Sequence, residues 1–456
     1  MKNIIELCKK AATAAGRKNI DEYEVFIASS IHNEIEVFNG NVENLSFANT
    51  KGIGFRVFKE KRMGYAYTSN VYGQELEKCL EKAIENSKIT GADDYNFLPS
   101  AKDYNYPASD IDRSMLFSER IYKYSTADKI NIAKHLESIA KKKDKRISGV
   151  SELIYNDNIS EIAIINSNGF EDSYRTSSAF IYLGLISRSG QDTSTGDYFG
   201  YERCPQDIDI ESIAENAAVR SVKLLGAKKI KSQSLDLLLD PFVSVQFLQV
   251  IAGITCADAV QKGKSLFAGK IGSKVFSKDF NIFDDGTLKS GMASKPFDAE
   301  GVPKGKTAVF EKGVLKSYLY NTYTARKDDT RSTGNASRSS YKTPPETGIS
   351  NFYIEPSKIT VEEIQSKITR GFYVMDIIGL HSGINPISGQ ISVGAKGIFI
   401  ENGEKTFPVK EVTIATDILS FCSSLSEVAD DLKFMPASGY VGSPSMLLNN
   451  ITLSGI

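Results

Sequence analysis

The first part of the chain alternates between helical and strand-like spacing of its apolar residues. Residues 2–15 and 74–90 place apolar side chains three and four positions apart, which is typical of helices that bury one face. Residues 22–38 instead alternate polar and apolar side chains, which predicts a pair of strands with one buried face. Further strands are expected at 45–49, 52–59 and 62–69. Asn39-Gly40 favours a tight turn between the first run and these further strands. We therefore expect an N-terminal α+β unit in which a meander sheet carries helices on one side.

A similar succession of patterns follows after residue 93. Residues 93–115 are rich in Asp, Asn, Tyr, Pro and Ser, which is typical of a linker or strap. Residues 117–143 have helical spacing, strand patterns run from 147 to 185, and another helix is expected at 210–226. This echo of the first unit is consistent with a duplication, or with the similarity that all α+β meanders share.

Short strands separated by glycine turns dominate the chain after residue 230. An apolar run at 234–239 predicts a buried strand, and similar runs continue almost to the C-terminus. Helical patterns interrupt them at about 242–263, 361–370 and 417–427. We expect an α+β protein whose C-terminal domain is β-rich, barrel- or sandwich-like, and decorated by helices. The expected domains are 1–92, 93–228 and 229–456.

Charge and cysteine usage narrow the class of protein. The 55 Lys and Arg residues balance 56 Asp and Glu residues, which argues against a direct nucleic-acid partner. Five scattered cysteines without CxxC spacing indicate reduced thiols in a cytoplasmic protein. No window approaches the roughly 18 apolar residues of a membrane span, so no membrane partner is expected.

Residues 294–338 combine the side chains that a binding site would need. Asp298 and Glu300 form a carboxylate pair, and Glu311-Lys312-Gly313 lies between two apolar runs, as in a hairpin. Residues 324–338 then form a loop rich in Arg, Ser, Thr and Asn. A polar loop carried by a rigid hairpin is a common place for a site, although an ordinary surface hairpin has the same composition.

Several motifs in this region carry a family resemblance. PFDAEG, GVLKSYL, TARK and STGNA follow one another between residues 296 and 336. HSGINPISG at 381–389 and ENGEKTFPVKEVT at 401–413 continue the series. The chain thereby resembles the TldD/PmbA family, also called modulator of DNA gyrase, and more closely its PmbA (TldE) branch. The resemblance covers most of the chain and is clearest after residue 230.

The resemblance also implies where a metal site should lie. The TldD branch carries an HExxxH zinc helix ahead of a segment that matches residues 264–272. By this count Leu248 and Gly253 occupy the histidine positions and Gln249 that of the catalytic glutamate, and none can perform these roles. The family's third ligand, a cysteine, has no counterpart in residues 438–443. We therefore expect no catalytic residue and no cofactor here, and zinc only in a TldD-type partner.

Two functions follow from the resemblance. The chain is expected to be the non-catalytic, PmbA/TldE-like subunit of a TldD/TldE-type metallopeptidase that acts on peptides. The alternative is a stand-alone homodimer that binds a peptide or protein, as a DNA gyrase modulator without protease activity. The candidate contacts to a substrate or partner are Asp298, Glu300, Arg326, Arg331, Asn335, Arg338, His381 and Asn385.

Overall fold

The computed structural model of the chain describes residues 4–104, 111–278 and 280–456. One antiparallel sheet of six strands, in the order β3-β2-β1-β4-β5-β6, organises the N-terminal half. Pairing of β1 with β4 makes this sheet continuous across residue 92. Its strands are β1 Glu22–Phe38, β2 Asn41–Lys59, β3 Arg62–Thr68, β4 Ile147–Asn166, β5 Glu171–Ser189 and β6 Asp192–Glu202.

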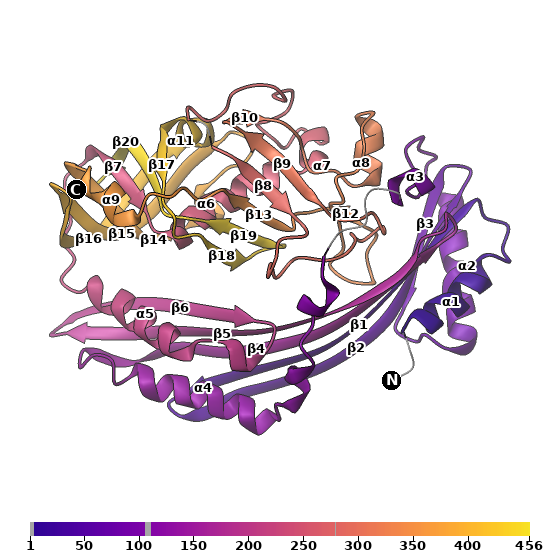
Figure 1. Cartoon of the computed structure of the whole chain (residues 1–456), viewed down its shortest axis with the longest axis horizontal. Helices are drawn as coiled ribbons and strands as arrows, with labels where there is room; N and C mark the ends of the chain where they lie inside the picture. Colours follow the sequence, from indigo (N-terminus) through magenta and orange to yellow (C-terminus); the bar gives the residue numbers. More distant parts are fainter. Residues whose placement is uncertain (1–3, 105–110, 279) are drawn as a thin grey trace.

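Four helices cover one face of this sheet (Figure 1). Odd-numbered residues of β1, from Val25 to Val37, point to that face because side chains alternate along a strand. At one end they pack against α1 Ile4–Ala15 and α2 Gly73–Ile89. At the other end they pack against α4 Thr126–Ala140, beside α5 Ile210–Lys223. The predicted meander sheet with helices on one side is confirmed. The strand pair predicted within residues 22–38 is the single strand β1, and the two strands predicted at 45–49 and 52–59 are the single strand β2.

The segment that leads into α4 differs from the expected helix at 117–143. A 3₁₀ turn, η2 Glu119–Lys123, precedes the helix. The Ser125 hydroxyl then accepts a hydrogen bond from Asp128 N, and the Asp128 carboxylate accepts one from Ser125 N. This capping box fixes the start of α4 at Thr126. The expected linker at 93–115 contains α3 Ala101–Tyr104 and η1 Arg113–Met115, and lies partly outside the described residues.

The opposite face of the sheet packs against the C-terminal half. Phe26, Ile164 and Tyr174 project from this face and form a buried cluster with Phe297 and Tyr341. The long, curved strands of the sheet lie beneath the C-terminal half in Figure 1. Among the described residues, no helix is both long enough and apolar enough to span a bilayer.

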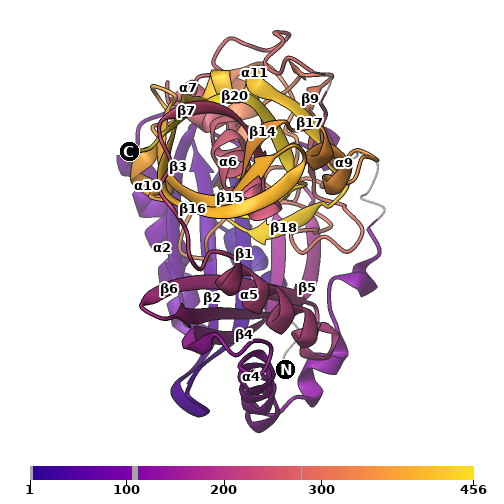
Figure 2. The ribbon, with the colours of Figure 1, turned by 90° about the vertical axis from the view of Figure 1, so that its left-hand side faces the viewer.

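The C-terminal half is built from a barrel and a second sheet (Figure 2). Five strands, β16-β15-β14-β7-β20, close into a barrel because β16 also pairs with β20, and β17 Leu425–Val428 extends from β20. This confirms the expectation of a β-rich, barrel-like domain. The barrel strands are β7 Gln233–Leu239, β14 Arg370–Ile378, β15 Gln390–Glu401, β16 Glu404–Asp417 and β20 Met446–Ser454.

The second sheet has six short strands in the order β10-β9-β8-β13-β19-β18. They are β8 Ile282–Asp285, β9 Lys306–Glu311, β10 Val314–Leu315, β13 Asn351–Ile354, β18 Lys433–Pro436 and β19 Tyr440–Ser443. The predicted hairpin turn is present, with Lys312 and Gly313 at positive φ. A two-stranded ribbon, β11 Ala336–Ser337 and β12 Glu346–Thr347, stands beside this sheet.

Helix α6 Pro241–Ile254 joins these two layers of the C-terminal half. It contacts both the barrel strand β14 and the second-sheet strand β19. The helix begins at Pro241 because the carboxylate of Asp240 caps it by accepting a hydrogen bond from Phe242 N. The other short elements are η3 Pro205–Asp207, α7 Ala257–Gln261, α8 Thr322–Lys327, α9 Val361–Ser366, α10 Leu380–Gly383 and α11 Ile418–Ser424.

Candidate functional site

A cavity of about 830 Å³ lies beside the C-terminal end of α6. The helix contributes Gln249, Ala252 and Gly253 to its wall. The opposite wall is formed by the ribbon β11–β12 with its connecting loop, and by the turn at 436–438. Two of the three positions that the resemblance assigned to zinc chemistry therefore face one cavity, as does Ser438 from the stretch without a cysteine.

The residues on this wall do not fit a zinc ion. Leu248 is buried in the hydrophobic core, whereas Gln249 and Gly253, one helical turn apart, reach the cavity. A side chain at Gly253 would meet no atom within 4 Å. A metal-ligating side chain would therefore fit at this position, but glycine provides none. Within the described residues, no group of three or more His, Cys, Asp and Glu side chains is placed to hold a metal.

The other polar groups of the cavity do not form a catalytic centre either. Burial raises the pKa of the Cys256 thiol to about 12, which keeps it protonated and a poor ligand or nucleophile. The Thr347 hydroxyl donates a hydrogen bond to the Asp258 carboxylate. No histidine is among the residues that line the cavity, so its serines have no imidazole base beside them. The residues that line the cavity present no nucleophile–base pair.

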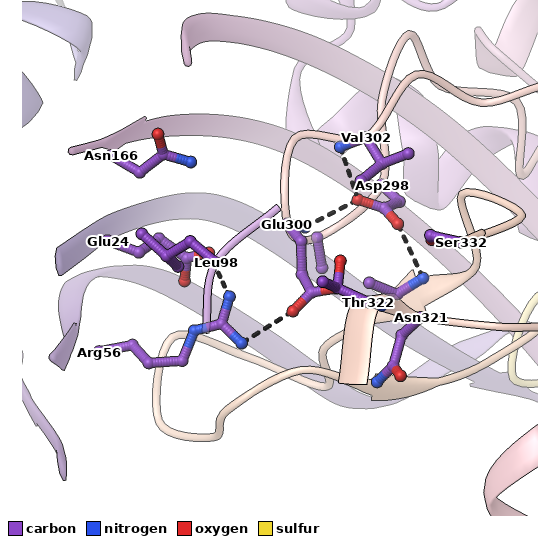
Figure 3. A network of polar contacts seen from close by, with 12 residues as sticks. Glu24, Arg56, Leu98, Asn166, Asp298, Glu300, Val302, Asn321, Thr322 and Ser332 are labelled. Atoms are coloured by element: carbon purple, nitrogen blue, oxygen red, sulfur yellow. Dashed lines mark hydrogen bonds and ion pairs between the residues drawn. The ribbon is translucent and has the colours of Figure 1, made fainter. Parts of the chain in front are cut away.

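The carboxylate pair of the PFDAEG motif lies inside the fold instead of in the cavity. Arg56 on β2 lies between two buried carboxylates (Figure 3): its Nη1 donates to Glu300 Oε1 at 2.8 Å and its Nη2 to Glu24 Oε2 at 2.7 Å. Glu300 Oε2 also accepts from Thr322 N at 2.9 Å. Burial would raise the pKa of Glu300, but Arg56 and the Thr322 N–H group outweigh it, so the pKa is lowered.

Asp298 organises the turn around this ion pair. Its carboxylate accepts hydrogen bonds from the backbone N–H groups of Glu300, Val302 and Ala336. Burial, followed by the charge of Glu300, raises the pKa of Asp298 to about 7. Both carboxylates are therefore engaged within the protein. Glu300 links the C-terminal half to β2 through Arg56, whereas Asp298 holds the turn to Ala336 within the C-terminal half.

The predicted basic loop is also more ordered than expected. It begins as α8, because Asn321 and Thr324 form a capping box. Arg326 donates to Leu98 O at 2.7 Å and lies over the Phe97 ring. Arg338 pairs with Glu24. Both guanidinium groups thus hold the N-terminal half, while Arg331 is exposed.

The three remaining predicted residues lie in different environments. Asn335 is buried and donates to Asp284 Oδ2 at 2.7 Å. Asn385 is exposed, and its side-chain oxygen accepts from Ile387 N and Ser388 N within a turn. His381 lies in α10, and its side chain falls outside the described residues.

Three cationic side chains that the sequence analysis did not single out lie close to the cavity. Lys295, Lys304 and Arg203 influence one another electrostatically without an ion pair to a carboxylate among the described residues. Lys295 stands only three residues before Asp298, but nothing in the local pattern indicated that its side chain would lie near two other cations.

Comparison with protein families assigns this fold to a class of metallopeptidases. Models of the PmbA/TldA metallopeptidase match three parts of the chain: domain 1 at residues 23–87, the central domain at 119–225 and the C-terminal domain at 232–455. The chain belongs to the PmbA/TldA metallopeptidase family and is PmbA/TldE-like within it.

Relatives in this family match over nearly their whole length. A metalloprotease PmbA homolog of Buchnera aphidicola is 27% identical over 440 residues, which cover 96% of this chain and 94% of the relative. Metalloprotease PmbA of Escherichia coli O157:H7 is 23% identical, with 95% and 92% covered. A metalloprotease TldD homolog of the same Buchnera is 24% identical, with 96% and 93% covered.

Solved structures show the same fold. A candidate modulator of a DNA gyrase from Thermotoga maritima superposes with a TM-score of 0.90 at 26% identity, covering 99% of this chain and all of that one. TldE from Thermococcus kodakarensis superposes with a TM-score of 0.87 at 23% identity over the full length of both chains. The second likeness supports the fold alone.

Proposed function

We propose that this chain is the non-catalytic subunit of a two-chain, cytoplasmic metallopeptidase, in which a TldD-type homologue supplies zinc and cuts peptides. One observation carries this proposal: the wall of α6 faces a peptide-sized cavity but offers Gln249 and Gly253 where ligands and a base would be needed. The chain's share of the work is then to bind the partner and to hold peptide.

An exposed strand edge supports association with another chain. Residues 41–52 of β2 pair with β1 on one side, whereas β3 pairs only with residues 53–59 on the other. Leu45 and Phe47 on this free edge are 51% and 64% exposed. Leu45 lies opposite the buried Ile35, so the apolar core continues outward to the edge. Unpaired, apolar edges of this kind are surfaces on which partner strands or chains dock.

Zinc content and peptide cleavage test the proposal. The purified chain should carry far less than one zinc per molecule and should not cleave unfolded peptides. Addition of a TldD-type homologue should yield a mixed complex that cleaves them. Stoichiometric zinc together with cleavage by the chain alone would refute the proposal.

The second candidate function is a stand-alone homodimer that binds a peptide or protein. The same β2 edge supports it, because two copies could pair through it as readily as two homologues. Light scattering separates the two proposals. Equal amounts of the chain and a TldD-type homologue should form a mixed dimer, whereas persistence of two separate homodimers favours the second function.

A further inference from the structure

A small hollow of about 70 Å³ adjoins the cavity beside α6. The two spaces share Ser337, Arg338, Ile349 and Ser438 in their walls. The hollow reaches inward to the interface between the N-terminal sheet and the PFDAEG turn. A group at the end of a peptide in the cavity could therefore enter it, while a larger segment could not.

Lys295 faces this hollow without a partner. No hydrogen bond or ion pair of its ammonium group exists among the described residues. The side chain is half-buried, and the charged groups that act on it are the cations Lys304 and Arg203. A cation without a counter-charge at the wall of a hollow is a site at which an anion can bind.

The neighbouring cations increase the positive potential. Lys304 also lines the hollow, and its ammonium donates only to neutral oxygens, Gly334 O at 2.8 Å and Ser350 Oγ at 2.6 Å. Arg203 donates only to backbone carbonyls, with Gly291 O at 2.8 Å. Burial, Lys304 and Arg203 together lower the pKa of Lys295 to about 8.

The neighbouring carboxylates do not cancel this positive potential. Asp298 lines the hollow, but its two oxygens already accept three backbone hydrogen bonds. Arg338 in the same wall is neutralised by Glu24. The buried carboxylates of Asp284 and Asp298 attract Lys304, whereas the charges that act on Lys295 are those of Lys304 and Arg203. Among the described residues of this wall, Lys295 is therefore the cation left to bind a ligand.

We propose that this hollow binds the C-terminal carboxylate of a peptide lying in the adjoining cavity, with Lys295 as the ligand to the carboxylate. The identity of the occupant as a peptide rests on the proposed function. A carboxylate satisfies the ammonium by a charge-assisted hydrogen bond, whereas a C-terminal amide offers only a neutral oxygen.

The test compares a peptide acid with the corresponding amide. Fluorescein-labelled tetra-alanine with a free C-terminal carboxylate, and the same peptide as a C-terminal amide, are titrated with this chain and with its complex with a TldD-type homologue. Fluorescence anisotropy should show that the acid binds at least about tenfold more tightly than the amide. Lys295→Met should bind both equally, and it should fold normally because it removes an uncompensated charge. Lys316→Met, which removes an exposed lysine of β10's neighbouring segment, should keep the preference.

Equal binding of acid and amide by the unaltered chain, binding of neither, or a preference that survives in Lys295→Met would overturn the inference. The proposed function fails separately. If the homologue neither associates nor cleaves while the chain alone still prefers the acid, the two-chain peptidase is wrong and the carboxylate site stands. If the complex cleaves acid and amide alike, the carboxylate site is wrong and the two-chain peptidase stands.

Discussion

Replacement of Arg56 by methionine should destabilise the protein strongly, because it removes the cation between two buried carboxylates. Arg56 is 5% exposed, and Glu24 and Glu300 are almost fully buried. Removing one member of such a network leaves charges that neither water nor a partner compensates. The change also disconnects β2 from the turn that carries Glu300.

The expected loss is about 3 kcal/mol of unfolding free energy, at the lower end of the range of roughly 3–5 kcal/mol for broken buried ion pairs. The lower end is expected because Glu24 keeps Arg338 and Glu300 keeps the Thr322 N–H group. Adding Glu300→Gln should restore at least about 1 kcal/mol, since it removes the uncompensated charge.

Urea denaturation followed by circular dichroism measures these effects, because the chain contains no tryptophan. Arg146→Met serves as control: Arg146 pairs with Asp144 on the surface, so its loss should be much smaller. A loss below about 1 kcal/mol for Arg56→Met, or no recovery when Glu300→Gln is added, would refute the conclusion that the buried ion pairs stabilise the fold.

The stability of the protein should depend on pH in opposite directions with and without Arg56. In the unaltered protein the pKa of Glu300 is lowered, so its contribution to stability is present above the unfolded pKa and lost as pH falls through the folded one. Without Arg56, burial should raise that pKa above the unfolded value. The variant should therefore lose stability as pH rises from about 5 to 8, and a pH-independent difference would contradict this reasoning.

Three further results are expected. Leu45→Arg with Phe47→Arg should abolish association with a TldD-type homologue by light scattering while leaving the circular dichroism spectrum unchanged; an intact complex would rule out the β2 edge. The preference for the peptide acid should fall as pH rises from about 7 to 9, because Lys295 loses its proton with a pKa of about 8 and Asp298 gains charge with a pKa of about 7; a flat profile would contradict it. Gly301→Ala should lower the urea midpoint, because φ is +86° there and the new methyl carbon would lie 2.6 Å from the Phe170 ring; an unchanged midpoint would contradict it.

Periodicity was sufficient to predict the layers of the fold. The alternation in β1 assigned one face to the helices, and the structure uses Val25 to Val37 in that way. The hairpin turn at Lys312-Gly313 followed equally from local sequence. These features depend on neighbours along the chain. The strand expected at 314–320 is shorter, because only Val314 and Leu315 pair with β9.

The candidate site was harder to predict because it depends on contacts between distant segments. Asp298 and Glu300 looked available in the sequence, yet Glu300 pairs with Arg56, 244 residues earlier. Asp298 accepts from backbone N–H groups of its own turn and from that of Ala336. Conversely, Lys295 resembles any surface lysine until Lys304 and Arg203 are brought near it. No local pattern reports which charged side chain will lack a partner.

This chain is proposed to contribute no catalytic group to the complex. The most direct test combines the unaltered chain with a TldD-type homologue whose HExxxH glutamate is replaced by glutamine, and measures peptide cleavage by the mixed dimer. We expect this mixed dimer to form and to show no cleavage. Cleavage that persists in the complex with the inactivated homologue would show that this chain carries chemistry of its own.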